Sequence, residues 1–135
     1  MKRHMKPKCG DCVTIERTIQ SSDVESFAEL SMDRNKIHFD EEFASGSLFG
    51  KPIAHGLIAG ALISGGLTKL MGDGNIWLSL DINFKHPAFV GNRLIAKLLI
   101  TDLDRRGIAT IDVLIKNEDS KSIISGTLKS MLARI

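Results

Sequence analysis

The sequence has few aromatic residues, no tyrosine, two cysteines and no long apolar run, and each shortage excludes a class of protein. Aromatic residues make up 5% of the 135 residues, which leaves little for a platform that stacks the bases of single-stranded nucleic acid. Two cysteines do not make a disulfide framework, so we expect a cytoplasmic protein. No apolar run reaches the roughly 18 residues that span a bilayer, and no apolar stretch follows the basic N-terminus as in a secretory signal. We therefore expect no membrane partner.

Positive charge is concentrated at the start of the chain, on Lys2, Arg3, Lys6 and Lys8. Removing these four charges from the formal net charge of +2 leaves −2 for residues 9–135. A body of that charge has little attraction for phosphate backbones, so we expect no nucleic-acid partner. The length fits one domain. We expect residues 1–12 to form a flexible basic tail and residues 13–135 to form the domain.

Glycine is concentrated in the most apolar part of the chain. Eight of the 12 glycines lie between Gly46 and Gly74. Residues 53–70 read IAHGLIAGALISGGLTKL and are apolar around nearly the whole circumference of a helix, which is typical of a buried helix. Each glycine costs about 1 kcal/mol relative to alanine within a helix. The glycines therefore indicate that a sheet or a ligand approaches this helix closely.

Strand patterns surround the apolar helix. Residues 77–85 alternate between apolar and polar side chains, which is the period of a half-buried strand. A short helix is expected from Ser22 to about Leu30. Four further segments are expected to be strands: 12–20, 93–101, 108–116 and 121–135. This order predicts an α+β fold in which an antiparallel sheet wraps around a long central helix, the hot-dog fold. Because the core of such a domain is small, we also expect a homodimer.

A polar segment before the helix contains a carboxylate and an imidazole, Asp33 and His38. Their separation of five residues would turn them about 140° apart on an α-helix, so a shared face requires an irregular turn. Asn35 suits such a turn because its side chain can hydrogen-bond the nearby backbone. Converging on one water, Asp33 and His38 would form a general acid/base pair near neutral pH. The alternative is that Asp33 caps a turn and His38 is an ordinary surface or packing residue.

The segment Pro52-Ile53-Ala54-His55-Gly56 opens the long helix, where backbone N–H groups are unpaired and lie at the positive end of the helix dipole. Without a Cβ, Gly56 would let a ligand oxygen approach its N–H. Such a donor suits an enolate-like oxygen in a transition state. The alternative is simply a tight helix entrance. Farther along the helix, Ser64 could line a substrate channel or permit close packing of the helix on the sheet.

Together these segments resemble the MaoC-like dehydratases, and among them most the (R)-specific enoyl-CoA hydratases. The family pattern has an aromatic residue, then Leu-Ser, one residue, Asp-x-Asn-Pro-hydrophobic-His, and later Pro-hydrophobic-x-His-Gly at the start of the central helix. The matching residues are, in order, Phe27, Leu30, Ser31, Asp33, Asn35, Ile37, His38, Pro52, Ile53, His55 and Gly56. Residues 83–92, NFKHPAFVGN, are similar to a second family pattern, and the resemblance covers roughly residues 13–135. Lys36 stands where the family usually has proline, and Asn92 where an acidic residue is usual.

The resemblance implies syn addition of water across the trans-2 double bond of an enoyl thioester, which gives an (R)-3-hydroxyacyl thioester; the reverse reaction is a dehydration. Asp33 would take a proton from the water that attacks C3, and His38 would bind the same water and help to deliver a proton to C2. The Gly56 N–H would form the oxyanion hole that polarises the thioester carbonyl. Three further residues would contact the substrate: Asn35, His55 and Ser64. No metal or organic cofactor is implied, because CoA, or an acyl carrier protein in its place, belongs to the substrate.

Two other functions remain open. One is a hot-dog acyl-CoA thioesterase, in which an activated water attacks the thioester carbonyl instead of C3. The other is a non-catalytic acyl-CoA binding module. The set of Asp33, Asn35 and His38 together with His55-Gly56 argues against the thioesterase. The presence of Asp33 and His38 argues against the binding module. A single Cys9-Gly10-Asp11-Cys12 motif offers, with His4, three possible zinc ligands and no closed four-ligand site, so we expect no metal.

Overall fold

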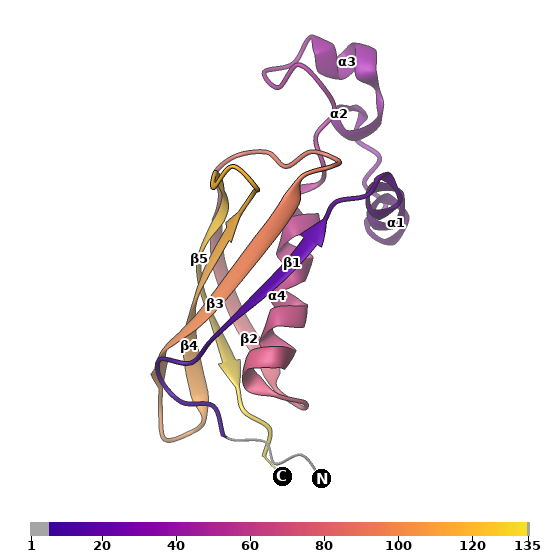
Figure 1. The fold of residues 1–135 in the computed structure, drawn as a ribbon. Helices are drawn as coiled ribbons and strands as arrows, with labels where there is room; N and C mark the ends of the chain where they lie inside the picture. Colours follow the sequence, from indigo (N-terminus) through magenta and orange to yellow (C-terminus); the bar gives the residue numbers. More distant parts are fainter. Residues whose placement is uncertain (1–5, 135) are drawn as a thin grey trace.

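The computed structural model describes residues 6–134, in which one antiparallel sheet lies against one long helix (Figure 1). The strands follow the order β1-β3-β4-β5-β2 across the sheet. Their bounds are β1 (Cys12–Thr18), β2 (Ile76–Phe84), β3 (Arg93–Leu103), β4 (Ile108–Lys116) and β5 (Ser122–Met131). The helices are α1 (Ser21–Ser31), α2 (Lys36–Phe39), α3 (Glu41–Ser45) and α4 (Gly56–Met71). This is the predicted α+β arrangement, with α4 as the long central helix.

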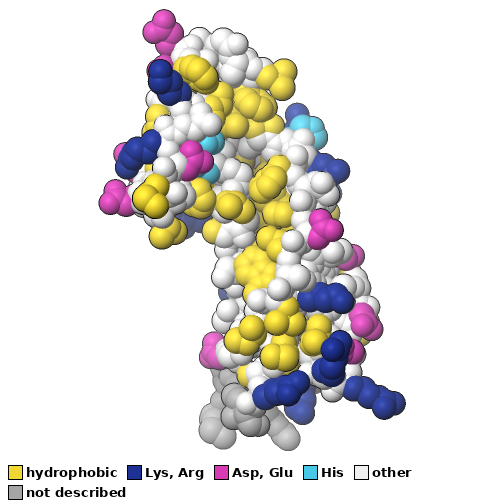
Figure 2. Space-filling model, turned by 180° about the vertical axis from the view of Figure 1, so that it is seen from behind, with side chains coloured by type: hydrophobic (Ala, Val, Ile, Leu, Met, Phe, Trp, Pro, Cys, Tyr) yellow, Lys and Arg dark blue, Asp and Glu magenta, His cyan; other side chains and the backbone are white. Residues whose placement is uncertain are grey.

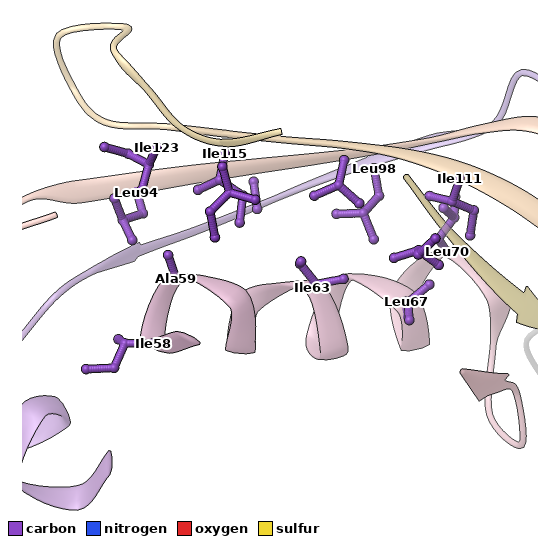
Figure 3. Packing of buried hydrophobic residues seen from close by; sticks show 14 of the residues in the cluster. Ile58, Ala59, Ile63, Leu67, Leu70, Leu94, Leu98, Ile111, Ile115 and Ile123 are labelled. Atoms are coloured by element: carbon purple, nitrogen blue, oxygen red, sulfur yellow. The ribbon is translucent and has the colours of Figure 1, made fainter. Parts of the chain in front are cut away.

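Helix α4 packs against the sheet mainly over β1 and β3. In Figure 3, Ala59 and Ile63 project from α4 toward the side chains of the sheet, and both are at most 1% exposed. A Cβ added at Gly66 would lie 3.1 Å from Cδ1 of Leu98 on β3. A Cβ at Gly65 would lie 3.3 Å from Cδ1 of Ile15 on β1. The sheet therefore approaches the helix as closely as its glycines indicated.

Two helices begin at other residues than the sequence predicted. Helix α4 begins at Gly56 and not at Ile53, because the N–H groups of Ile53 and Ala54 donate to the carbonyls of Ile37 and Ala88 outside the helix. Helix α1 begins at Ser21, and the carboxylate of Asp23 accepts from the N–H of Gln20 at 2.9 Å. The hydrogen-bonded guanidinium of Arg17, 2.6 Å from Asp23, also lowers the pKa of this carboxyl group.

One face of α4 and the neighbouring edge of the sheet are uncovered. Helix α4 was predicted to be buried all round, but residues 57, 61, 64 and 68 on one of its faces are exposed. Strand β2 lies at the edge of the sheet, and its exposed large apolar side chains are Ile76, Trp77, Leu78, Leu80 and Phe84. Figure 2, which views the molecule from behind, shows hydrophobic side chains gathered along much of this side.

The N-terminal segment is hydrogen-bonded to β3 from Gly10 onward. The N–H of Gly10 donates to the carbonyl of Ile100 at 2.8 Å, and the N–H of Ile100 donates to the carbonyl of Asp11 at 2.9 Å. Cys9 and Cys12 are exposed free thiols. Residues 1–5 of the predicted tail, including His4, lie outside the described residues. Within residues 6–134, no helix is long and apolar enough to cross a membrane.

Replacing Gly126 should disrupt the pairing of β2 with β5. An added Cβ would clash with the carbonyl oxygen of Asp81 and lie 2.7 Å from Cα of Ile82, and backbone atoms cannot move aside as a flexible side chain can. We expect Gly126→Ala to lower the free energy of unfolding, measured with urea, by at least about 2 kcal/mol. Gly46→Ala is the matched control, since its Cβ would meet only the carbonyl of Phe43 at 3.7 Å. Equal urea midpoints for the two variants would contradict this expectation.

Candidate active site

A cavity of about 450 Å³ lies at the N-terminal end of α4. Four of the six residues singled out from the sequence line it: Asp33, His38, His55 and Gly56. Most of the remaining lining is apolar: Phe27, Phe49, Ile53, Ala54, Leu57, Ala59, Phe84, Pro87, Ala88 and Ile123. The cavity therefore combines a few polar groups with an apolar wall, which is the usual composition of a small-molecule site.

Three side chains shape the turn that carries Asp33. The hydroxyl of Ser31 donates to the carbonyl of Phe27 at 2.6 Å and accepts from the N–H of Asp33 at 3.1 Å. The carboxylate of Asp33 then accepts from the N–H of Asn35, and the side chain of Asn35 accepts from the N–H of Ile37, both at 3.1 Å. These bonds form the irregular turn that was predicted to bring Asp33 and His38 together, and Asn35 caps α2. They hold the turn although Lys36 provides no fixed φ angle as proline would.

Asp33 and His38 face each other across 4.0 Å, measured from Oδ2 to Nε2. The His38 side chain is 8% exposed and that of Asp33 is 49% exposed. Nδ1 of His38 lies 2.7 Å from the carbonyl oxygen of Ile53. Because a carbonyl oxygen only accepts, Nδ1 carries the proton and Nε2 of the neutral ring has a free lone pair toward Asp33. A water about 2.8 Å from both atoms would fit across this gap and donate one hydrogen to each.

His55 lies behind this pair and is 3% exposed. Its ring stacks on His38 with centroids 3.8 Å apart, and the ring of Phe27 lies 4.8 Å away on α1. Nε2 of His55 lies 2.9 Å from the carbonyl oxygen of Asp33. Its Nδ1 is buried and has no hydrogen-bond partner among the described residues. His55 therefore links the start of α4 to the backbone of Asp33.

Gly56 is the first residue of α4, and its N–H has no acceptor within residues 6–134. It lies at the positive end of the dipole of a 16-residue helix. A Cβ at this position would lie 2.8 Å from the ring of Phe84. The absence of a side chain thus makes room for Phe84, another residue that lines the cavity, in addition to leaving the N–H open to a ligand oxygen.

The structure does not place Asn35 and Ser64 in the wall of this cavity. Asn35 serves the turn, as described above. Ser64 is exposed on the uncovered face of α4, eight residues or about 12 Å along the helix from Gly56. The cavity also includes residues that the sequence reasoning did not assign to the site, among them Phe49, Phe84 and His86. Only the pattern NFKHPAFVGN, noted for its resemblance, pointed to part of this set.

A metal ion would find up to three ligands here. One ligand atom each of Asp33, His38 and His55 lies within 4.8 Å of the others. Each histidine already uses one ring nitrogen on a backbone carbonyl. An ion in this position would occupy the two atoms that can share a water, so metal binding and activation of that water exclude each other.

Comparison with known proteins identifies the family. The family model described as MaoC like domain matches residues 9–122. The chain is 34% identical over 119 residues to an (R)-specific enoyl-CoA hydratase of Aeromonas caviae, and the match covers 87% of this chain and 89% of that protein. It is 42% identical over 90 residues to a 3-hydroxybutyryl-CoA dehydratase of Methylorubrum extorquens, a match that covers 66% of this chain and 57% of that protein.

A solved structure shows the same likeness in three dimensions. The (R)-hydratase from A. caviae involved in PHA biosynthesis superposes with a TM-score of 0.88 at 32% identity, over 93% of this chain and 96% of that chain. With these matches over most of its length, the chain belongs to the MaoC-like dehydratase family and has the hot-dog fold predicted from its sequence.

Proposed function

We propose that the protein is an (R)-specific enoyl-CoA hydratase, which adds water reversibly to a trans-2-enoyl thioester. The observation that supports this most is the 4.0 Å gap between Oδ2 of Asp33 and Nε2 of His38, at the wall of an apolar cavity. Two acceptors at that distance suit one shared water. The similarity to an enzyme of A. caviae named for this reaction supports the same proposal.

The arrangement suggests how each group would act. The shared water donates to Asp33 and to Nε2 of His38, and its oxygen attacks C3 of the substrate. One proton of the water passes to Asp33, while the electrons of the double bond move through C2 toward the thioester oxygen. Nε2 of His38 holds the water by accepting its other hydrogen, and with this help the proton on Asp33 passes to C2 on the same face. The products are a C3–OH and a C2–H bond, which is syn addition.

Gly56 would supply the electrostatic part of the mechanism. Charge develops on the thioester oxygen as C3 is attacked, and an N–H at the N-terminus of a helix stabilises such charge. The apolar wall of the cavity suits the acyl chain. Lys85 and His86 line the cavity, and the ammonium of Lys51 lies 4.3 Å from the centre of the nearby Phe89 ring. These cationic or polar groups could contact the phosphates of CoA or of a carrier-protein arm.

The reaction consists of the addition of water to C3 and proton transfers, so the proposal includes no metal and no organic cofactor. CoA, or an acyl carrier protein, enters as part of the substrate. The cytoplasmic location expected from the low cysteine content is part of the same proposal.

We further propose that the working form is a homodimer. Leu57 on the uncovered face of α4 lines the same cavity as Phe84 of the edge strand β2, and a second copy would bury the exposed apolar side chains of both elements. Ser64 lies on that face, so dimerisation would decide whether its hydroxyl lines an acyl site. This arrangement would also explain why a helix without a polar face is buried on one side only.

Two parallel assays test the proposed reaction. With crotonyl-CoA, we expect the enoyl absorbance to fall while no free thiol appears. Thiol release without hydration would identify a thioesterase and overturn the proposal. Neither signal, with acyl chains of several lengths, would favour the non-catalytic binding module.

Replacing either member of the pair should remove most of the activity. We expect Asp33→Asn and His38→Ala each to lower kcat at least about a hundredfold, because the first removes the base that takes the water's proton and the second removes the nitrogen that holds the water. Asp73→Asn, an exposed change just beyond the far end of α4, should leave kcat unchanged. Near-normal turnover of either site variant, with a folded structure by circular dichroism, would show that the residues are wrongly assigned.

Introducing charge on the apolar edge should separate the dimer. We expect the wild type to sediment as a dimer and Leu80→Lys as a monomer, since an unpaired ammonium cannot be buried cheaply in an apolar interface. Asp112→Lys places the same side chain at an exposed position of β4 in the middle of the sheet and should remain dimeric. A monomeric wild type, or a dimeric Leu80→Lys variant, would contradict the proposed interface.

A further inference from the structure

We infer that His55 is a positioning residue for the acid/base pair, and that its bond to the Asp33 carbonyl, and not a contact with substrate, is its role. The inference rests on the proposed function for its catalytic consequence. It goes beyond the resemblance, which places His55 among the residues that touch the substrate. Its basis is a pair of reciprocal bonds between two histidines and two backbone segments.

Each of the two histidines forms a hydrogen bond with the backbone of the segment that carries the other. His38, on α2, donates from Nδ1 to the carbonyl of Ile53 at 2.7 Å, just before α4. His55 is the N-cap of α4, and its Nε2 lies 2.9 Å from the carbonyl oxygen of Asp33, just before α2. Each imidazole therefore holds the backbone of the segment that carries the other, and the two rings stack with centroids 3.8 Å apart.

The bond from His55 matters because the other bonds of Asp33 are local. Those to Ser31 and Asn35 span two residues each and would move together with the turn. The bond from His55 spans 22 residues and ties the turn to the start of α4, where the Gly56 N–H also lies. The Asp33 side chain is 49% exposed and is not fixed by burial. The distance of 4.0 Å to His38 thus depends on how its backbone is held.

One ring nitrogen of His55 already has a partner, and the other is buried. Nε2 donates to a carbonyl that can only accept, which fixes the proton on Nε2 in the neutral ring. Nδ1 is buried with no partner among the described residues, and a buried acceptor without a partner is unfavourable. A phenylalanine would fill the same space and avoid that unpaired atom. The imidazole therefore contributes through its Nε2–H bond, at some expense of stability.

Two substitutions separate the bond from the stacking. His55→Phe keeps an aromatic ring and loses the donor, whereas the amide nitrogen of His55→Gln can reach the place of Nε2 and keeps the donor. We expect His55→Phe to unfold in urea at the same or a higher concentration than the wild type, yet to lose about a hundredfold in kcat for crotonyl-CoA hydration with little change in KM. His55→Gln should recover at least about a tenth of the wild-type kcat.

These outcomes distinguish positioning from other roles. Equal losses of kcat in both variants, or losses that follow a fall in stability, would overturn the inference and leave His55 as a packing residue. A raised KM with unchanged kcat would also overturn it and would restore the substrate contact.

A measurement on the resting protein does not depend on the reaction. In the ¹⁵N spectrum of the wild type, we expect the proton of His55 on Nε2 and that of His38 on Nδ1. The carbonyl ¹³C signal of Asp33 should shift in His55→Phe and stay close to its original place in His55→Gln. A proton on Nδ1 of His55, or an unmoved Asp33 signal, would contradict the hydrogen bond from Nε2 of His55 to the Asp33 carbonyl. If the wild type shows this pattern but hydrates no enoyl thioester, the proposed function is wrong, while the positioning of Asp33 by His55 is confirmed.

Discussion

The close approach of α4 to the sheet is the contact on which the rest of this structure depends. Gly66 lets the helix come so near to β3 that an added Cβ would meet Leu98 at 3.1 Å. Ala59, Ile63 and Leu67 are at most 2% exposed as a result. Full burial of one Ile or Leu side chain contributes about 1.5–3 kcal/mol, which offsets the cost of about 1 kcal/mol for a glycine within the helix. The same contact fixes where the N-terminus of α4 lies.

The site is assembled at that N-terminus from two segments that are not held by the sheet. Residues 31–39 provide Asp33 and His38, and the chain entering α4 provides His55 and Gly56. Hydrogen bonds in both directions join the segments: Ile53 to Ile37 through the backbone, and each histidine to the opposite backbone. The rigid helix α4 thus has a fixed position, and the hydrogen bonds of the two imidazoles hold the largely exposed turn against its N-terminus. An acid/base pair requires such support from a rigid element, because a small displacement of either group would disturb its geometry.

The sequence predicted the fold well because its patterns were regular. The strand expected at 108–116 is found with the same bounds, since its alternating side chains face core and solvent in turn. The strand expected at 121–135 ends at Met131. Boundaries at the helix ends were less accurate: Ile53 looks helical by hydropathy, but tertiary hydrogen bonds to Ile37 and Ala88 keep this stretch extended. The short helices α2 and α3 begin at the side-chain caps Asn35 and Asp40, and the sequence indicated the turn at Asn35.

By itself, the sequence determined the fold class, the glycine-lined contact of α4, and the types of residue at the site, because periodicity and motif are local properties of a chain. The tertiary structure decided distances and directions. It brought Asp33 to 4.0 Å from His38 and left Ser64 outside the cavity. It also placed Nε2 of His55 against the backbone carbonyl of Asp33 and buried its Nδ1. These features depend on how segments 15 or more residues apart in the chain pack together, and no local pattern specifies that packing.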